Sequence, residues 1–311
     1  MTTDSPRELA VYVGPAEAPA ITEAVRRGGG RLVPLDQAEA LVWVGGGPRA
    51  FDLPLSEHIS WVQLPSAGIE GWFSAGAIDP ARTWTSAAGA YAQTCAEHAV
   101  ALLLAGVRGI PTALAQRTWE QPTMESATGS LRGAKVAIIG AGGIGRAMIP
   151  MLTPFGAEII AVNRSGNPVE GAAETVPADR LGTVWPRVDH VMLAAPSTAE
   201  TRHLVDAGVL AQLKPTSWVV NVARGSLIDT DALVDALANE SIGGAGLDVT
   251  DPEPLPDGHP LWKEPRAIIT PHVANPTAGA MRELAERVEA NVARRISGQD
   301  LLGVVDFDAG Y

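Results

Sequence analysis

Cysteine is almost absent from this chain of 311 residues, which contains Cys95 and no other cysteine. A disulfide framework needs cysteine pairs, and a structural zinc site usually draws on several thiolates, so we expect neither. The single thiol lies in "YAQTCAEHAVALLLAGV" (residues 91–107), where a small buried residue on an apolar helix is the simplest interpretation. We therefore predict no metal site.

Basic residues are also few. The chain has 23 Lys and Arg against 35 Asp and Glu, which gives a net charge of −12. A field of this sign repels the phosphate backbone of nucleic acids, so nucleic acid is not an expected partner. Any anionic ligand must be held by positive groups placed locally.

Long apolar runs are missing as well. The longest, "AVALLLAGV" at residues 99–107, is shorter than the roughly 20 residues that span a bilayer. The amino terminus "MTTDSPRELAVYVG" lacks the basic region followed by an apolar stretch that is typical of a signal peptide. These features predict a soluble, cytoplasmic protein with no membrane partner.

Short β-type runs alternate with helical patterns along most of the chain. They are nearly continuous apolar runs, which is typical of parallel strands buried on both faces. The runs form two series, at residues 9–14, 31–35, 40–45 and 61–65, and at residues 135–140, 158–163, 190–196, 217–223, 243–249 and 267–272. They predict an α/β protein with two doubly wound, Rossmann-like domains built on parallel sheets. A helix is expected near the carboxyl end, at 277–298, followed by a last strand at 301–307.

The motif "GAGGIG" follows the buried run "KVAIIG" and precedes a helical pattern. A strand, a glycine-rich turn and a helix in this order are typical of a loop that binds the pyrophosphate of a dinucleotide. Gly140 permits the tight turn, Gly142 lets the pyrophosphate approach the backbone, and Gly145 lets the helix pack on the strand. The loop residues expected at the cofactor are Gly140, Gly142, Gly143, Ile144 and Gly145.

The next strand ends in "AVNRSGN", residues 161–167. In NAD-binding chains an Asp or Glu about 20 residues after the first glycine grips the ribose hydroxyls. This chain has Asn163, Arg164 and Ser165, and Asn163 lies 23 positions after Gly140. These donors suit a 2′-phosphate, which a carboxylate would repel. We therefore expect NADPH, with NADH as the alternative if Arg164 stacks on the adenine or points into solvent.

Three further stretches are "NVARGSLIDTDALVDAL", "GLDVTDPEPLPDGHPLW" and "IITPHVANPT". With the glycine loop they resemble the D-isomer-specific 2-hydroxyacid dehydrogenases, closest in character to the glyoxylate/hydroxypyruvate reductases. "LPSAGIEGW" at residues 64–72 is similar to the carboxylate-binding loop of that family, and "CAEHAVALLLAGVR" at 95–108 is similar to its interdomain helix. The resemblance covers nearly the whole chain.

The resemblance implies a domain organisation. The family has two Rossmann-like domains with the active site in the cleft between them, and it usually forms homodimers. A substrate-binding, flavodoxin-like domain is expected at residues 1–98 plus 283–311, because the last helix of the family returns to the first domain. The dinucleotide-binding domain is expected at residues 99–282.

The resemblance also implies catalytic residues. Arg224 matches the arginine that binds the substrate carboxylate and keto oxygen, Glu253 matches the acid, and His272 matches the histidine. Reduction of a 2-keto acid needs hydride on carbon and a proton on oxygen, and a histidine hydrogen-bonded to a carboxylate suits the proton transfer. The backbone N–H groups of Ala67 and Gly68 are expected to hold the substrate carboxylate from the other side.

Four more positions complete the set of candidates. Pro196 and Asp248 are implied as further cofactor contacts. His98, in "AEHA", either faces the active site or packs within its helix. Trp119 lies in a segment where some relatives place a tryptophan at the substrate pocket.

The predicted function is hydride transfer between NADPH and a small 2-keto acid, such as glyoxylate or hydroxypyruvate, to give the D-2-hydroxy acid. An alternative is an NAD-dependent dehydrogenase of a D-2-hydroxy acid such as 3-phosphoglycerate, although residues 64–72 offer no cation for a substrate phosphate. A third hypothesis is a non-catalytic, dinucleotide-sensing binding protein, which the presence of Arg224, Glu253 and His272 disfavours.

Overall fold

The computed structural model describes residues 8–308 and residue 310. It contains two compact units: unit 1 lies within Met1–Tyr91 and Pro276–Tyr311, and unit 2 comprises Ala92–Asn275. Residues 1–7, which belong to the segment without a signal-peptide pattern, lie outside the described residues.

Unit 1 is built on a parallel sheet of five strands in the order β2-β1-β3-β4-β5. This order is that of flavodoxin-like sheets. β3 and β4 are buried along their whole length, which accounts for their continuous apolar character. The strands are Leu9–Gly14 (β1), Gly30–Leu32 (β2), Ala40–Trp43 (β3), Trp61–Gln63 (β4) and Thr83–Thr85 (β5).

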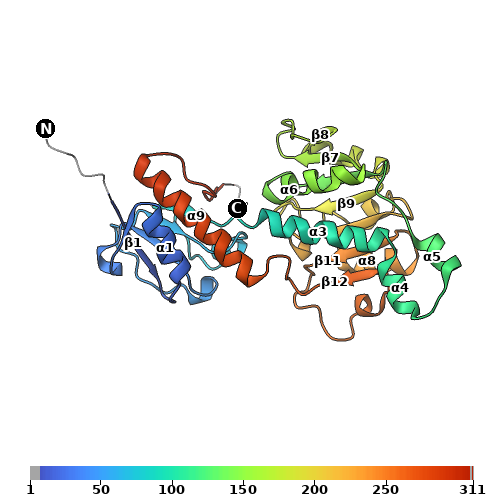
Figure 1. The fold of residues 1–311 in the computed structure, drawn as a ribbon, viewed down its shortest axis with the longest axis horizontal. Coiled ribbons are helices and arrows are strands. Elements are labelled where there is room, and N and C mark those ends of the chain that lie inside the picture. The colour runs from blue at the N-terminus through green and yellow to red at the C-terminus, as the bar shows by residue number, and fades with distance from the viewer. Residues whose placement is uncertain (1–7, 309, 311) are drawn as a thin grey trace. The chain divides into compact units, whose positions relative to one another are not determined.

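Helices α1 (Pro19–Arg27) and α9 (Thr277–Ser297) lie side by side in unit 1, in blue and red in Figure 1. Gly28 permits the close approach, since a Cβ atom there would lie 2.7 Å from the carbonyl oxygen of Glu289. The carboxyl-terminal helix is thus part of the core of unit 1, and α2 (Glu70–Ser74) follows β4. The helix pair and β1 share a core that includes Val11, Ile21, Val25, Val288 and Val292.

Unit 2 is built on a parallel sheet of seven strands in the order β12-β11-β10-β9-β6-β7-β8. The chain reverses its direction of travel across the sheet between β6 and β9, as in Rossmann folds. The strands are Lys135–Ile139 (β6), Glu158–Asn163 (β7), Glu174–Pro177 (β8), His190–Leu193 (β9), Trp218–Asn221 (β10), Gly244–Leu247 (β11) and Ala267–Ile269 (β12). The two parallel sheets confirm the predicted fold class.

Helices cover both faces of the unit 2 sheet. One apolar core joins α3 and α6 to the sheet, and a second joins α7 and α8 to the other face. Among the described residues no single helix is long and apolar enough to cross a membrane; α3 and α4 pass that test only as a pair, which is bent by 57°. The helices of unit 2 are Ala92–Val107 (α3), Ile110–Gln116 (α4), Gln121–Ala127 (α5), Gly143–Leu152 (α6), Ala207–Leu210 (α7) and Thr230–Ala238 (α8).

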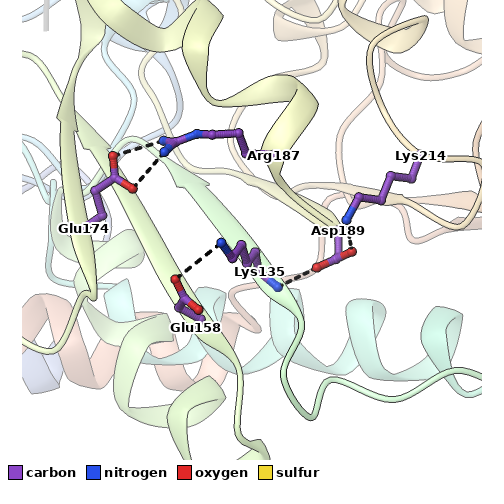
Figure 2. Close-up of polar contacts among 6 residues, drawn as sticks. All are labelled: Lys135, Glu158, Glu174, Arg187, Asp189 and Lys214. Atoms are coloured by element: carbon purple, nitrogen blue, oxygen red, sulfur yellow. Dashed lines mark hydrogen bonds and ion pairs between the residues drawn. The ribbon is translucent and has the colours of Figure 1, made fainter.

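Ion pairs lie at the amino-terminal edge of the unit 2 sheet. Figure 2 shows Asp189, just before β9, between the ammonium group of Lys214 and the backbone N–H of Lys135, which it accepts at 2.7 Å. Arg187 contacts Glu174 of β8 with both terminal nitrogens, at 3.0 and 3.2 Å. Such half-exposed pairs stabilise little individually, but they occupy the edge opposite to the one where ligands of α/β sheets bind.

The structure corrects one predicted strand and adds two. Residues 301–307 form no strand: Val304 makes an isolated antiparallel bridge to Thr85, and Gly303 adopts a left-handed φ of +71°, which interrupts an extended segment. β5 and β8 have only three and four residues, too few for a recognisable apolar run.

Candidate active site

The candidate residues of unit 2 follow the carboxyl ends of its strands. The glycine loop follows β6, Asn163 ends β7, Pro196 follows β9, and Arg224 follows β10. Asp248 and His272 come after β11 and β12. All these strands are parallel, so the residues share one edge of the sheet, where ligands bind in open α/β folds.

Each glycine of the loop meets a different environment. Gly140 has φ +97°, and a Cβ atom there would lie 2.4 Å from the backbone nitrogen of Ala195. A Cβ atom on Gly145 would lie 2.3 Å from the carbonyl oxygen of Gly140, so this residue sets the contact between helix and loop. A Cβ atom on Gly142, the N-cap of α6, would meet nothing within 4 Å. The open space at Gly142 and the N–H groups of Gly143 and Ile144 fit a dinucleotide pyrophosphate.

The turn after β7 is held by Asn163 itself. Its side-chain oxygen accepts the N–H of Gly166 at 2.6 Å, and its amide nitrogen donates to the carbonyl oxygen of Asn167 at 2.8 Å. The neighbours Arg164 and Ser165 are exposed at the tip of this turn. Asn163 therefore shapes the turn that presents the two other donors, a role that spacing alone does not reveal.

Glu253 and His272 are paired. The Nδ1 atom of His272 lies 2.7 Å from Oε1 of Glu253, and both side chains are about half exposed. The structure thus brings together two residues that are 19 positions apart. With Nδ1 directed to the carboxylate, Nε2 is the nitrogen that remains for a substrate.

Asp248 organises the turn that carries His272. Its buried carboxylate accepts the N–H of Val273 at 2.9 Å and of Ala274 at 3.0 Å, and its carbonyl oxygen accepts the N–H of His272 at 2.8 Å. His272 has a φ of +53°, in the left-handed region that side chains other than glycine rarely adopt. Asp248, predicted as a cofactor contact, therefore supports the backbone on both sides of the catalytic candidate.

Arg224 lies in a loop that is packed against the Glu253 segment. A Cβ atom on Gly225 would lie 2.0 Å from the carbonyl carbon and oxygen of Thr250, so the loops after β10 and β11 touch at this glycine. The buried Asn221 donates to the carbonyl oxygen of Arg224 at 2.8 Å, which fixes the backbone that carries the guanidinium. Sequence reasoning missed Asn221; its signal is an amide at the end of an apolar strand.

His98 and Thr270 also belong to this edge. The Nε2 atom of His98, on α3, lies 2.9 Å from Oγ1 of Thr270, which donates to Oδ1 of Asp248 at 2.6 Å. Thr270 was not predicted, although it stands two residues before His272. Of the two alternatives for His98, the structure shows a side chain directed to the Asp248 turn.

The remaining candidates lie elsewhere. Ala67 and Gly68 are in unit 1, in a loop held by hydrogen bonds from Trp72 to Ser66 and from Tyr91 to the carbonyl oxygen of Pro65. Trp119 is 90% exposed between α4 and α5, so no described residue encloses it. Pro196 is half-buried at the end of the β9 segment.

A cavity of about 850 Å³ opens at the opposite, amino-terminal edge of the unit 2 sheet. Its lining includes Arg132, His190, Trp218 and Arg266, and none of the predicted site residues. Burial lowers the pKa of His190 to about 4, so this lining histidine is neutral near pH 7. The strand ends that carry the candidate site face the other way, and we assign the chemistry to them.

Comparisons with known proteins agree with this placement of the site. A family described as "D-isomer specific 2-hydroxyacid dehydrogenase, NAD binding domain" matches residues 100–274. An "Uncharacterized protein in proB 3'region" of Corynebacterium melassecola is 42% identical over 294 residues, 93% of this chain and 96% of that protein. A glyoxylate reductase of Thermofilum pendens is 34% identical over 222 residues, 69% of this chain and 65% of that protein.

Other matches are more partial or concern the fold. A D-3-phosphoglycerate dehydrogenase of Mycobacterium bovis is 33% identical over 220 residues, 70% of this chain, but this chain spans only 41% of that protein. A crystal structure of a D-isomer specific 2-hydroxyacid dehydrogenase from Xanthobacter autotrophicus has a TM-score of 0.81. It is 24% identical and covers 98% of this chain and 100% of its own, so the likeness is one of fold.

Proposed function

The chain belongs to the D-isomer specific 2-hydroxyacid dehydrogenase family, and from this we propose that it is an NADPH-preferring reductase of a small 2-keto acid. Membership makes it an NAD(P)-dependent oxidoreductase. The proposed substrates are glyoxylate and hydroxypyruvate, reduced to the D-2-hydroxy acid. The observation that carries the proposal is the contact of Glu253 with His272 at the sheet edge that also carries the glycine loop.

His272 is the proposed proton donor. A bound nicotinamide supplies the hydride for the substrate's carbonyl carbon. The carbonyl oxygen then needs a proton, which Nε2 of His272 gives because Nδ1 is directed to Glu253. The carboxylate of Glu253 keeps the ring oriented and offsets the positive charge of the protonated imidazole.

Arg224 and the loop of unit 1 are the proposed carboxylate binders. The planar guanidinium of Arg224 carries five N–H donors in a fork that matches a carboxylate. Its backbone is fixed by Asn221 and by the contact of Gly225 with Thr250. The N–H groups of Ala67 and Gly68 are proposed to bind the same carboxylate.

Arg164 and Ser165 are the proposed readers of the 2′-phosphate. They are exposed at the tip of the turn that Asn163 holds, after β7, at the same sheet edge as the glycine loop. Hydrogen bonds to charged groups contribute roughly 1.5–3 kcal/mol each. Arg164 is therefore expected to favour NADPH over NADH by about ten- to a hundredfold.

The test is a set of absorbance assays at the nicotinamide band. Glyoxylate, hydroxypyruvate, pyruvate and phosphohydroxypyruvate are each supplied with NADPH or NADH, using the wild type, Arg164→Ala and Arg180→Ala. Arg180 is an exposed arginine in the segment after β8, so its variant controls for loss of one cation. The proposal expects turnover of the first two acids, with a preference for NADPH that only Arg164→Ala loses. Equal use of NADH by the wild type contradicts the cofactor assignment.

The second candidate is an NAD-dependent oxidation of D-3-phosphoglycerate. The match to the Mycobacterium bovis enzyme favours it, although the match leaves out more than half of that protein. The loop at 64–72 carries Glu70 and no cation, which disfavours a substrate with a phosphate. In the same assays this function predicts turnover of phosphohydroxypyruvate with NADH.

Two further expectations accompany the proposal. We propose that the protein is a cytoplasmic homodimer, which sedimentation of the purified chain tests for the dimer. A dinucleotide-sensing protein without activity would instead bind the cofactor tightly and turn over none of the four acids.

A further inference from the structure

A chain of three polar side chains leads from helix α3 to the turn of His272. Nε2 of His98 lies 2.9 Å from Oγ1 of Thr270, and Oγ1 of Thr270 lies 2.6 Å from Oδ1 of Asp248. The carboxylate is buried, whereas the side chain of His98 is 24% exposed. All three residues belong to unit 2, and His98 is the one contributed by a helix.

The direction of the hydrogen bonds follows from their chemistry. A carboxylate only accepts, so Thr270 donates its hydroxyl proton to Asp248. The hydroxyl oxygen of Thr270 is then the acceptor, and Nε2–H of His98 is the donor. His98 thus polarises a hydroxyl that is already bound to the carboxylate.

The same carboxylate supports the catalytic candidate. Oδ1 of Asp248 accepts the N–H of Val273, and Oδ2 accepts the N–H of Ala274, immediately after His272. His272 needs this support because its φ of +53° is unfavourable for a residue with a side chain. A shift of Asp248 would move both bonds, and with them the imidazole that contacts Glu253.

We propose that His98 is a positioning residue for His272, acting through Thr270 and the carboxylate of Asp248. The inference rests on the proposed function, since it concerns the same site. It also names a second role for α3: besides packing in the core of unit 2, this helix anchors the loop that donates the proton. A side chain at position 98 must therefore offer an N–H at the reach of Nε2.

A pair of exchanges at each end of the chain tests this. His98→Gln keeps an N–H at similar reach, whereas His98→Leu removes it. Thr270→Ser keeps the hydroxyl, whereas Thr270→Val replaces it with a methyl group of the same shape. We expect His98→Leu and Thr270→Val to lower kcat by between about ten- and a hundredfold, as for a misplaced catalytic group, with KM for the cofactor nearly unchanged. His98→Gln and Thr270→Ser should recover most of kcat.

Coupling gives a sharper criterion. If His98 acts through Thr270, the double variant His98→Leu/Thr270→Val should be no slower than the slower single variant. Losses that multiply would overturn the proposal, as would a kcat for His98→Gln as low as that for His98→Leu. His58→Leu, the same exchange at an exposed histidine of unit 1, is the control.

A readout without turnover separates this inference from the proposed function. Hydrogen exchange of the Val273 and Ala274 amides reports whether the carboxylate of Asp248 still holds them. We expect faster exchange in His98→Leu and Thr270→Val, and near-normal exchange in the two conservative variants. Absence of wild-type turnover with normal protection of both amides would reject the proposed function alone. Unchanged exchange and unchanged kcat in both removal variants would reject the positioning role alone.

Discussion

The Nδ1 atom of His272 lies 2.7 Å from Oε1 of Glu253, in a turn where His272 holds a φ of +53°. The pair leaves Nε2 for the substrate, so His272→Ala should remove the proton donor. We expect kcat to fall by about 10²–10⁴-fold, the usual contribution of general acid–base catalysis. Cofactor titration should show nearly unchanged binding, because the glycine loop is untouched.

Glu253 is expected to matter less than His272 and in a graded manner. Glu253→Gln keeps an oxygen that can accept from Nδ1, whereas Glu253→Ala removes the partner. The Ala variant should therefore lose more kcat than the Gln variant, by steady-state kinetics with the acid that the wild type prefers. Equal losses would mean that charge, and not orientation, is what Glu253 contributes.

Gly142 and Gly145 should respond in opposite ways to alanine. A Cβ atom at 145 would lie 2.3 Å from the carbonyl oxygen of Gly140, so Gly145→Ala should lower the free energy of unfolding by about 1–3 kcal/mol. Gly142 faces open space and has a φ of −80°, so Gly142→Ala should fold with stability within about 0.5 kcal/mol of the wild type.

The cofactor distinguishes the two glycine variants further. The methyl group of Gly142→Ala would occupy space proposed for the pyrophosphate, and we expect its Kd for NADPH to rise at least about tenfold, equal to about 1.4 kcal/mol. Urea denaturation and fluorescence titration measure the two effects separately. A Gly142→Ala protein that binds NADPH normally would place the pyrophosphate elsewhere.

The main lines of the fold were predictable because they depend on local pattern. Strands buried on both faces must be apolar throughout, which is why β6, β7, β9 and β10 stand out in the sequence. The glycine loop was predictable for a similar reason, since strand, turn and helix are adjacent. β5 and β8 were missed because three or four residues carry too little pattern.

The supporting residues of the site could not be predicted because their partners are remote in sequence. His98 and Thr270 are 172 positions apart, and only the packing of α3 on the sheet brings them together. Asn163 shows the reverse case, since its partners Gly166 and Asn167 are adjacent, but the expectation of a ligand contact hid the simpler turn. Residue type predicts chemistry at a strand end; which atoms are already engaged depends on tertiary contacts.

Asn291 is expected to be a main determinant of the stability of unit 1. It is fully buried on α9, where its amide donates to Oε1 of Gln63 at 2.9 Å and to the carbonyl oxygen of Leu302 at 3.0 Å. Its own oxygen accepts the N–H of Leu302 at 2.8 Å. Asn291→Leu would leave these buried groups unpaired, and each unpaired group costs about 1–3 kcal/mol.

The buried amide pair offers an internal comparison. Gln63→Leu combined with Asn291→Leu removes both partners of one hydrogen bond, so the double variant should be less destabilised than the sum of the single variants. Urea unfolding measured for all four proteins gives the coupling. Strict additivity would show that the bond between Asn291 and Gln63 does not contribute.

His190 should make stability depend on pH. Burial lowers its pKa to about 4 from 6.5, an effect that the charge of Asp189 only partly opposes, while Lys214 lowers it further. Between these values the unfolded chain binds a proton at this histidine that the folded chain does not bind. Stability therefore rises with pH across this window and is lost as the pH falls from 6.5 toward 4, by up to about 3 kcal/mol.

A variant that cannot titrate isolates this effect. Nδ1 of His190 accepts the backbone N–H of Trp218 at 3.2 Å, and the side-chain oxygen of Asn in His190→Asn can take over that bond. Urea unfolding near pH 7 and near pH 4.5 should show a smaller loss for His190→Asn than for the wild type, while the exposed His58→Asn behaves as the wild type. An equal loss in all three proteins would assign the acid sensitivity to other groups. Because the carboxyl pKa that is lowered here, that of Asp189, starts from 3.8, its contribution is lost only below this window, so the comparison reports on the histidine.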